Sequence, residues 1–386
     1  MSAAKVGCLL VAAVLVGMAV FTFSQSTSPS TAAPSPGAAP ELALPAADEL
    51  RLLFLYGSEK ESWIVDSTKR FNAARHDAGG GKHITVEAVP MGSGESIDEI
   101  LSGRRKAHLV SPASGAFITR GNAQSRAATN ADLVASSENL VLSPVVIAMW
   151  KPMAEALGWP GKPVGWSDVL ALAKDPRGWG AVGQAQWGQF RFGHTHPEYS
   201  NSGLISLLAE TYAGAGKTAG LELADLDRPE VGAYVAGIEQ AVVHYGSSTG
   251  FFGKKMFANG PRYLSAAVLY ENMVIESYAD AAKLAFPVVA IYPKEGTFWS
   301  DHPVGIVERE WVGAAERAAA KRYIAFLLEK PQQEAALALG FRPGSVEVKT
   351  AAPIDAAHGV DPAEPRTTLE MPSAPVIDGV LRLWHQ

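Results

Sequence analysis

Short turns rich in serine and glycine are the residues of this sequence whose types and positions first suggest chemistry. Ser58, Ser93, Ser114 and Ser202 each stand at the start of a predicted helix. A helix start has unpaired backbone N–H groups and a partial positive charge, so such a turn binds a small anion or carboxylate without a side-chain cation. A serine in the same place can also simply cap its own helix. Both interpretations stay open for each serine, and a binding role is expected if the fold brings the four turns together.

Other polar residues accompany these turns. Tyr270 and Glu271 end an apolar run that predicts a strand. Side chains at the carboxyl end of a strand face the ligand crevice in open α/β sheets, although structural hydrogen bonding is an equal alternative here. The predicted ligand-binding residues are Ser58, Glu59, Ser93, Ser114, Thr195, His196, Ser200, Ser202, Tyr270 and Glu271.

The two histidines of the segment His194-Thr195-His196 raise the question of a metal site. Side chains at i and i+2 of an extended segment point the same way, and Glu271, or Asp301 with His302, could complete a ligand set. The sequence shows no fourth ligand, and polar contact to a ligand or support of the turn are the alternatives. We therefore predict neither a metal nor a cofactor.

Several function classes are disfavoured. The chain has no G-x-S-x-G, no P-loop lysine motif and no H-E-x-x-H, and Gly92 to Gly94 lacks the third glycine of a dinucleotide site. The net charge is −6, without a basic block, which argues against nucleic acid as a partner. The sequence thus predicts a binding protein and not an enzyme.

The N-terminus predicts export. Lys5 is followed by the uncharged, mostly apolar run Val6 to Phe23, which fits a signal peptide or an uncleaved membrane anchor. Residues 24–48 form a Pro/Ser/Ala-rich linker that lacks the apolar surface to fold. Cys8 is the single cysteine, so no disulfide is expected in the remainder. We expect everything after the apolar run to lie outside the cytoplasmic membrane.

From residue 50 onward, strands and helices alternate, which predicts an α/β fold with a parallel sheet covered on both faces. The pattern predicts helices over Lys60 to Ala78 and Glu230 to His244, and a strand near Ala266 to Tyr270. Two late helices, Ala314 to Leu328 and Gln332 to Leu339, are expected to pack back on the first lobe.

Two long apolar strands that contain proline, Leu140 to Trp150 and Leu284 to Ile291, are predicted to lead to a second lobe and back. The expected organisation is a solute-binding domain of residues 49–350, with lobe I at about 49–143 and 292–350, lobe II at about 144–291, and a C-terminal tail of 351–386.

Several short motifs along the chain indicate a more specific fold family. They are Gly57-Ser58-Glu59-Lys60, Gly92-Ser93-Gly94, Ser111-Pro112-Ala113-Ser114, Trp166-Ser167-Asp168-Val169-Leu170, Phe192 to Pro197 with Ser200 to Leu204, Ile291 to Thr297, and Gln333 to Pro343. In this order they resemble the type II periplasmic (extracellular) solute-binding proteins, in the molybdate-binding-like group, including a subgroup often fused to von Willebrand A domains.

The resemblance implies a two-lobed periplasmic binding protein fold with two crossing hinge strands. It implies that the lobes close around a small polar or anionic solute, which is then presented to the membrane subunits of an ABC-type importer. The alternative is a membrane-anchored interaction or sensory module with a solute-binding fold and no transport role.

Overall fold

The computed structural model describes residues 48–386. The predicted export segment at residues 6–23 and the linker up to residue 47 lie outside the described residues. Within residues 48–386, none of the helices combines the length and apolar character that a membrane span requires.

The first sheet has six strands in the order β2-β3-β1-β4-β12-β5. β1 runs parallel to β3 and β4, as the sequence predicts, whereas β12 is antiparallel to β4 and β5. The parallel order of the first three predicted strands is confirmed, and β2, β12 and β5 extend the sheet with antiparallel pairs that the sequence did not indicate. The bounds are β1 Glu49–Gly57, β2 Asp77–Gly79, β3 Lys82–Met91, β4 Leu109–Ser111, β5 Val134–Asn139 and β12 Pro303–Val307.

Helices cover both faces of this sheet because β1 is apolar on both sides. Leu53 and Leu55 join one apolar core, while Phe54 and Tyr56 join another, as the two-residue period of a strand requires. The helices facing Phe54 are α1 Glu61–Ala73, α11 Ala314–Leu328 and α12 Lys330–Ala338, and those facing Leu53 are α2 Ser93–Leu101 and α3 Gly115–Thr129. The prediction that the two late helices return to this sheet is confirmed.

The second sheet follows the order β10-β6-β9-β7-β8. β6 is antiparallel to β9 and β10, whereas β7 is parallel to β8 and β9. Its strands are β6 Val141–Trp150, β7 Phe192–Thr195, β8 Val242–Gly246, β9 Ala266–Tyr270 and β10 Val288–Ile291. Its helices are α4 Lys151–Ala156, α5 Trp166–Lys174, α6 Asn201–Ala215, α7 Leu223–Leu226, α8 Pro229–Glu239, α9 Thr249–Asn259 and α10 Glu271–Ser277.

Two predicted helices end earlier than expected. The helix expected over Lys60 to Ala78 ends at Ala73, and the one expected over Glu230 to His244 ends at Glu239. In the second case the chain turns directly into β8, whose β-branched Val242 and Val243 favour a strand.

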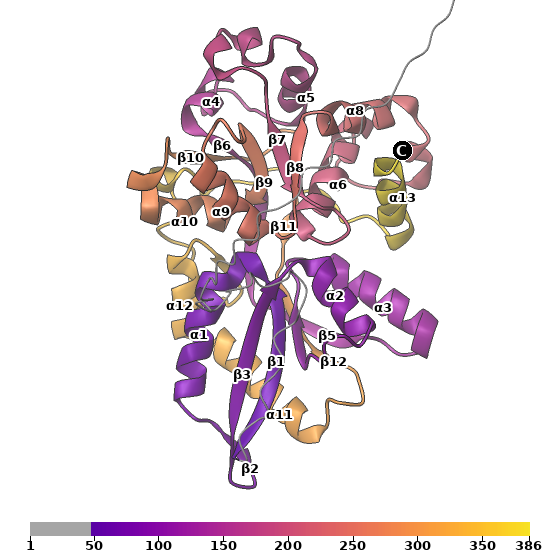
Figure 1. Ribbon diagram of the computed structural model, residues 1–386, viewed down its shortest axis with the longest axis vertical. Helices are drawn as coiled ribbons and strands as arrows, with labels where there is room; N and C mark the ends of the chain where they lie inside the picture. Colours follow the sequence, from indigo (N-terminus) through magenta and orange to yellow (C-terminus); the bar gives the residue numbers. More distant parts are fainter. Residues whose placement is uncertain (1–47) are drawn as a thin grey trace, which may run out of the picture. The chain divides into compact units, whose positions relative to one another are not determined.

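The chain passes between the two sheets three times. β5 ends at Asn139 and β6 begins at Val141; β10 is followed by β11 (Trp299–Ser300), which pairs with β6, and then by β12. β13 (Arg342–Pro343) also pairs with β6, and the C-terminal helix α13 (Ala374–Trp384) then packs on α6, α7 and α8 (Figure 1). The fold is two-lobed, and the lobe limits given above stay a prediction.

Candidate functional site

Helices begin at the carboxyl ends of strands in both sheets, and these helix starts meet. In the first sheet they follow β1, β3 and β4; in the second they follow β7, β8 and β9. Such strand ends are where open α/β sheets bind ligands. The sequence therefore places backbone N–H groups and short polar side chains on both sides of one interface.

Hydrogen bonds join the two sides directly. The Ser58 hydroxyl donates to Ser248 Oγ at 2.8 Å and accepts from the backbone N–H of Gly250 at 3.0 Å. Farther along, the N–H of Gly94 donates to the carbonyl oxygen of Tyr199 at 2.9 Å. The glycines permit this approach, because a Cβ on Gly94 or Gly250 would overlap backbone atoms of the opposite side. The structure is thus a closed arrangement in which the helix starts touch.

A buried network of hydroxyl and amide groups lies on the side of the second sheet. Thr249 Oγ1 donates to Ser202 Oγ at 2.9 Å, and Ser202 Oγ is 2.8 Å from Thr195 Oγ1. Ser200 Oγ lies 3.3 Å from Thr249 Oγ1. Asn201 Nδ2 donates to Tyr270 Oη and to Ser300 Oγ, both at 3.0 Å.

The first sheet contributes a buried, charge-balanced cluster. Lys60 Nζ donates to Glu59 Oε1 at 2.7 Å and lies 3.2 Å from His302 Nδ1. Burial alone would raise the pKa of the Glu59 carboxyl, but Lys60 and His302 hold that pKa at about 2. Burial and the Lys60 charge lower the pKa of His302. The cluster therefore holds one cation, one anion and a neutral imidazole.

Four buried polar atoms in this region have no hydrogen-bond partner among the described residues: Tyr56 Oη, Ser111 Oγ, Asn201 Oδ1 and His302 Nε2. Leaving such a group unpaired costs about 1–3 kcal/mol each, and native structures rarely tolerate it without a ligand or ordered water. Tyr56 and Ser111 are paired across β1 and β4, and the rings of Tyr270 and His302 lie 5.5 Å apart. Both sides of the interface thus offer unused hydrogen-bonding capacity.

A cavity of about 350 Å³ opens beside this interface, lined from one side by Ser58 and Glu61 and from the other by Lys254, Met273 and Glu276. Its volume is within the usual range for small-molecule sites. Burial raises the pKa of Glu276 to about 7.

The structure brings together most of the residues predicted from the sequence. Ser58, Glu59, Thr195, Ser200, Ser202 and Tyr270 belong to the buried interface described above. Ser93 Oγ accepts from the N–H of Ala113 at 3.0 Å, which ties two helix starts together. Ser114 caps α3 through the N–H of Ala116, so the capping interpretation holds for this serine. Whether any of them binds a ligand stays a prediction.

Two predicted residues lie apart from the network. Glu271 forms an ion pair with Arg342 at 2.8 Å and also accepts from Tyr292 Oη, which ties it to β13 and the return strand. His196 stacks on Tyr199, with ring centroids 4.5 Å apart, and meets the edge of Trp384. These contacts keep Glu271 and His196 outside the hydroxyl network, and a ligand-binding role for either of them stays a prediction.

The ligand set that the sequence suggested for a metal ion does not assemble in the structure. His194 faces Glu239, His302 faces Glu59 and Lys60, and Glu271 is bound to Arg342. His194 hydrogen-bonds to Glu239 and His196 stacks on Tyr199. The two histidines therefore do not share one ligand set with Glu271 or with His302.

Sequence reasoning missed Asn201, Ser248, Thr249 and Ser300 as members of the interface. A signal existed for two of them: Ser248 and Thr249 precede a helix after the β-branched run of β8, the same pattern that marked the other turns. The expectation of a helix through His244 concealed it.

Comparisons with known proteins agree with this architecture. The chain resembles a solved periplasmic thiamin-binding protein (13% identity, TM-score 0.61, 88% of this chain and 98% of that one). It also resembles the periplasmic binding protein P5PA (14%, 0.57, 86% and 98%) and iron-bound HitA from Pseudomonas aeruginosa (15%, 0.54, 87% and 98%). At these identities the likeness shows the fold. No curated protein matches the sequence.

The family follows from the sequence match and from the closed, two-sided polar interface. A family model described as bacterial extracellular solute-binding protein matches residues 67–361, which is more than half of the chain. This protein therefore belongs to the family of bacterial extracellular solute-binding proteins.

Proposed function

We propose that this protein closes its two lobes around a small polar or anionic solute and delivers it to the membrane subunits of an ABC importer. The observation that carries the proposal is the set of unpartnered buried atoms at the interface, above all Asn201 Oδ1 at the start of α6 and His302 Nε2 just before β12. A solute between the two sides satisfies these atoms and adds contacts made only in the closed state. Binding energy then favours closure, as a hinged receptor requires.

The local electrostatics favour an anionic group on the solute. Helix starts from both sides bring their partial positive charge to the interface, although N–H groups such as those of Gly94 and Gly250 are already hydrogen-bonded in the closed state. Lys60 is neutralised by Glu59, so recognition rests on N–H and O–H donors.

Asn201 Oδ1 can only accept a hydrogen bond. The Tyr56 and Ser111 hydroxyls and the Nε2–H of a neutral His302, by contrast, can donate one. A carboxylate or oxyanion solute that also carries a hydroxyl or amine donor matches this set.

The route to the membrane is part of the same proposal. Residues 6–23 would direct export, as a cleaved signal or as an anchor, and residues 24–48 would tether the domain outside. The solved relatives include proteins described as binding thiamin and iron, so fold alone does not name the solute. The motif order supports a place in the molybdate-binding-like group and its von Willebrand A-linked subgroup.

A ligand screen tests the proposal. The purified protein is melted in the presence of oxyanions, carboxylates, sugar phosphates, amino acids and divalent cations, and hits are titrated by calorimetry. We expect an anionic or polar class to raise the melting temperature. Asn201→Asp keeps the shape of the side chain but adds a negative charge among the donors, so we expect it to weaken an anionic hit at least 100-fold.

Asn259→Asp, which makes the same charge change on the exposed end of α9, is the matched control and should bind like the unmodified protein. The transport step is tested by comparing uptake of the identified solute between cells that contain the protein and cells that lack it. Equal affinity in the Asn201→Asp and Asn259→Asp variants would exclude the interface as the solute site.

A further inference from the structure

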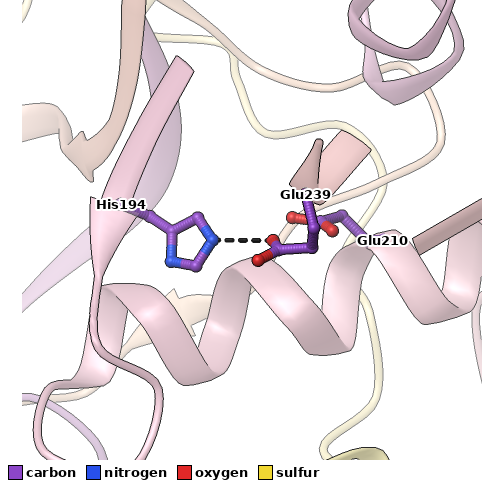
Figure 2. Close-up of side chains that lie close together, drawn as sticks. All are labelled: His194, Glu210 and Glu239. Atoms are coloured by element: carbon purple, nitrogen blue, oxygen red, sulfur yellow. Dashed lines mark hydrogen bonds and ion pairs between the residues drawn. The ribbon is translucent and has the colours of Figure 1, made fainter. Parts of the chain in front are cut away.

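A second cluster of ionisable groups lies in the second lobe, away from the solute interface. Figure 2 shows His194, Glu210 and Glu239 converging from β7, α6 and α8. One ligand atom from each lies within 4.8 Å of the others. His194 and Glu210 are fully buried, and the Glu239 side chain is 12% exposed. Neither the family description nor the solute proposal gives these residues a role.

The hydrogen bonds around His194 leave one ring nitrogen aimed at the carboxylates. Nδ1 lies 2.7 Å from the carbonyl oxygen of Thr195, which can only accept, so Nδ1 carries a hydrogen. Nε2, with the lone pair of the neutral ring, then faces Glu239 Oε1 at 2.8 Å. Two acceptors at this distance need a proton or a cation between them. A carbonyl behind the ring is also the support that metal-binding histidines commonly have.

Both carboxylates are held by neighbouring donors. Glu239 Oε2 accepts from Tyr245 Oη at 2.7 Å and from the indole N–H of Trp384 at 2.9 Å. Glu210 Oε1 accepts from the Ser206 hydroxyl at 2.7 Å. Glu210 Oε2 is buried and has no hydrogen-bond partner among the described residues. This oxygen is the independent sign that something is missing from the cluster.

Charge and size both suit a divalent ion. With a neutral imidazole and two ionised carboxylates, the cluster has a net buried charge of −2, which is costly unless it is balanced. Without a cation the cluster needs two protons to balance this charge. In a tetrahedral site with ligands at about 2.0–2.2 Å, neighbouring ligand atoms lie about 3.3–3.6 Å apart, so separations in the cluster must change by about 1 Å when the ion binds.

We propose that His194, Glu210 and Glu239 form a site for a divalent transition cation. The nitrogen ligand favours zinc, and the two carboxylates also accommodate manganese, whereas magnesium and calcium prefer oxygen ligands alone. Trp384 lies over the site from α13, so the ion also secures the C-terminal helix through Glu239.

Metal analysis and titration of the full-length protein test this site. We expect the protein as isolated to contain zinc or manganese in about stoichiometric amount. After chelation, either ion should raise the melting temperature, because a ligand that binds only the folded state stabilises it. Magnesium and calcium should have little effect. Glu210→Gln keeps the side-chain shape and the contact to Ser206 but removes one anionic ligand, so we expect at least a 100-fold loss of metal affinity.

Two further variants separate a metal site from a buried polar network. Glu308→Gln makes the same change at a half-buried carboxyl that is paired with Arg317, outside both sites, and should bind metal normally. Trp384→Phe removes the donor to Glu239, and loss of such a supporting contact should weaken metal affinity about tenfold or more. Solute affinity is measured as an independent readout, because the hydroxyl network at the interface does not include Glu210, Glu239 or Trp384.

A protein that contains no metal and melts at the same temperature with and without zinc or manganese would show a protonated network only. Metal binding that survives Glu210→Gln would place the ion elsewhere. Either result overturns the proposal and leaves the solute site untouched.

Discussion

Ser58 Oγ and Ser248 Oγ lie 2.8 Å apart although 190 residues separate them in the chain. Ser58 follows a strand of the first sheet, and Ser248 follows a strand of the second. The same Ser58 oxygen accepts from the Gly250 N–H. A single hydroxyl therefore fastens two helix starts that must separate when the lobes open.

Ser58→Ala should shift the ligand-free protein toward the open state. Two hydrogen bonds that exist only on closure are lost, each with a net value of about 0.5–1.5 kcal/mol. The open population should rise several-fold or more, visible as a larger radius of gyration by small-angle X-ray scattering. For a solute bound at this interface, affinity should fall by about one to two decades.

Ser114→Ala is the control for this prediction, because Ser114 caps α3 within one lobe. Its loss should cost about 1 kcal/mol of stability and leave the radius of gyration unchanged. If the two variants behave alike, Ser58 is only a cap.

Gly250→Ala should prevent full closure without harming the helix. Gly250 lies in the first turn of α9 with ordinary helical space around it, except that a Cβ would overlap the Ser58 carbonyl group. Alanine is the better helix former by about 1 kcal/mol, so stability should hold while solute affinity drops at least tenfold. Gly232→Ala on α8, where the nearest atom to a Cβ is 3.5 Å away, should leave affinity unchanged.

The Glu59–Lys60 pair should show strong coupling in stability. Lys60→Met leaves a buried carboxylate without its partner, which typically costs about 3–5 kcal/mol. Combining it with Glu59→Gln removes both charges, and most of the lost stability should return. Urea unfolding of the two single variants and the double variant measures the coupling. Additive losses would mean that the two charges act independently despite their 2.7 Å separation.

Stability should fall between about pH 5 and pH 7 through Glu276. Its folded pKa is about 7 against a usual value of 4.5. In that interval the folded state holds a proton that the unfolded state has released, so the free energy of unfolding decreases with pH by at most about 3 kcal/mol. The difference in unfolding free energy between the protein and Glu276→Gln, followed across this interval, isolates the effect. A difference that does not change with pH would contradict it.

Local patterns predicted the elements well. The helix over Ala314 to Leu328 and the strand over Ala266 to Tyr270 agree with the structure at both ends, because apolar periodicity and flanking turns determine them. The strand β12 was not foreseen, and its antiparallel pairing depends on a partner more than 160 residues earlier in the chain. Such pairing leaves no periodic signal in the strand itself.

The same contrast between local patterns and long-range contacts applies to the candidate site. Turns at helix starts are visible in sequence, so Ser58 and Ser202 were found. Glu271 was assigned to the interface because it follows a strand, but Arg342, which lies 71 residues away, binds it instead. An ion pair between distant segments overrides what local position predicts, and sequence reasoning from one chain cannot detect it.

The three passages between the sheets have a mechanical consequence. One end of β6 pairs with β11 at Ser143 and Pro144 and with β13 at Val141 and Leu142, so short ladders brace the connection on more than one side. Because ladder hydrogen bonds join these passages of the chain, the connection is stiffer than a single strand and restricts how the lobes can move. Opening should then follow a restricted path, and its rate sets how long a captured solute is held before it is released.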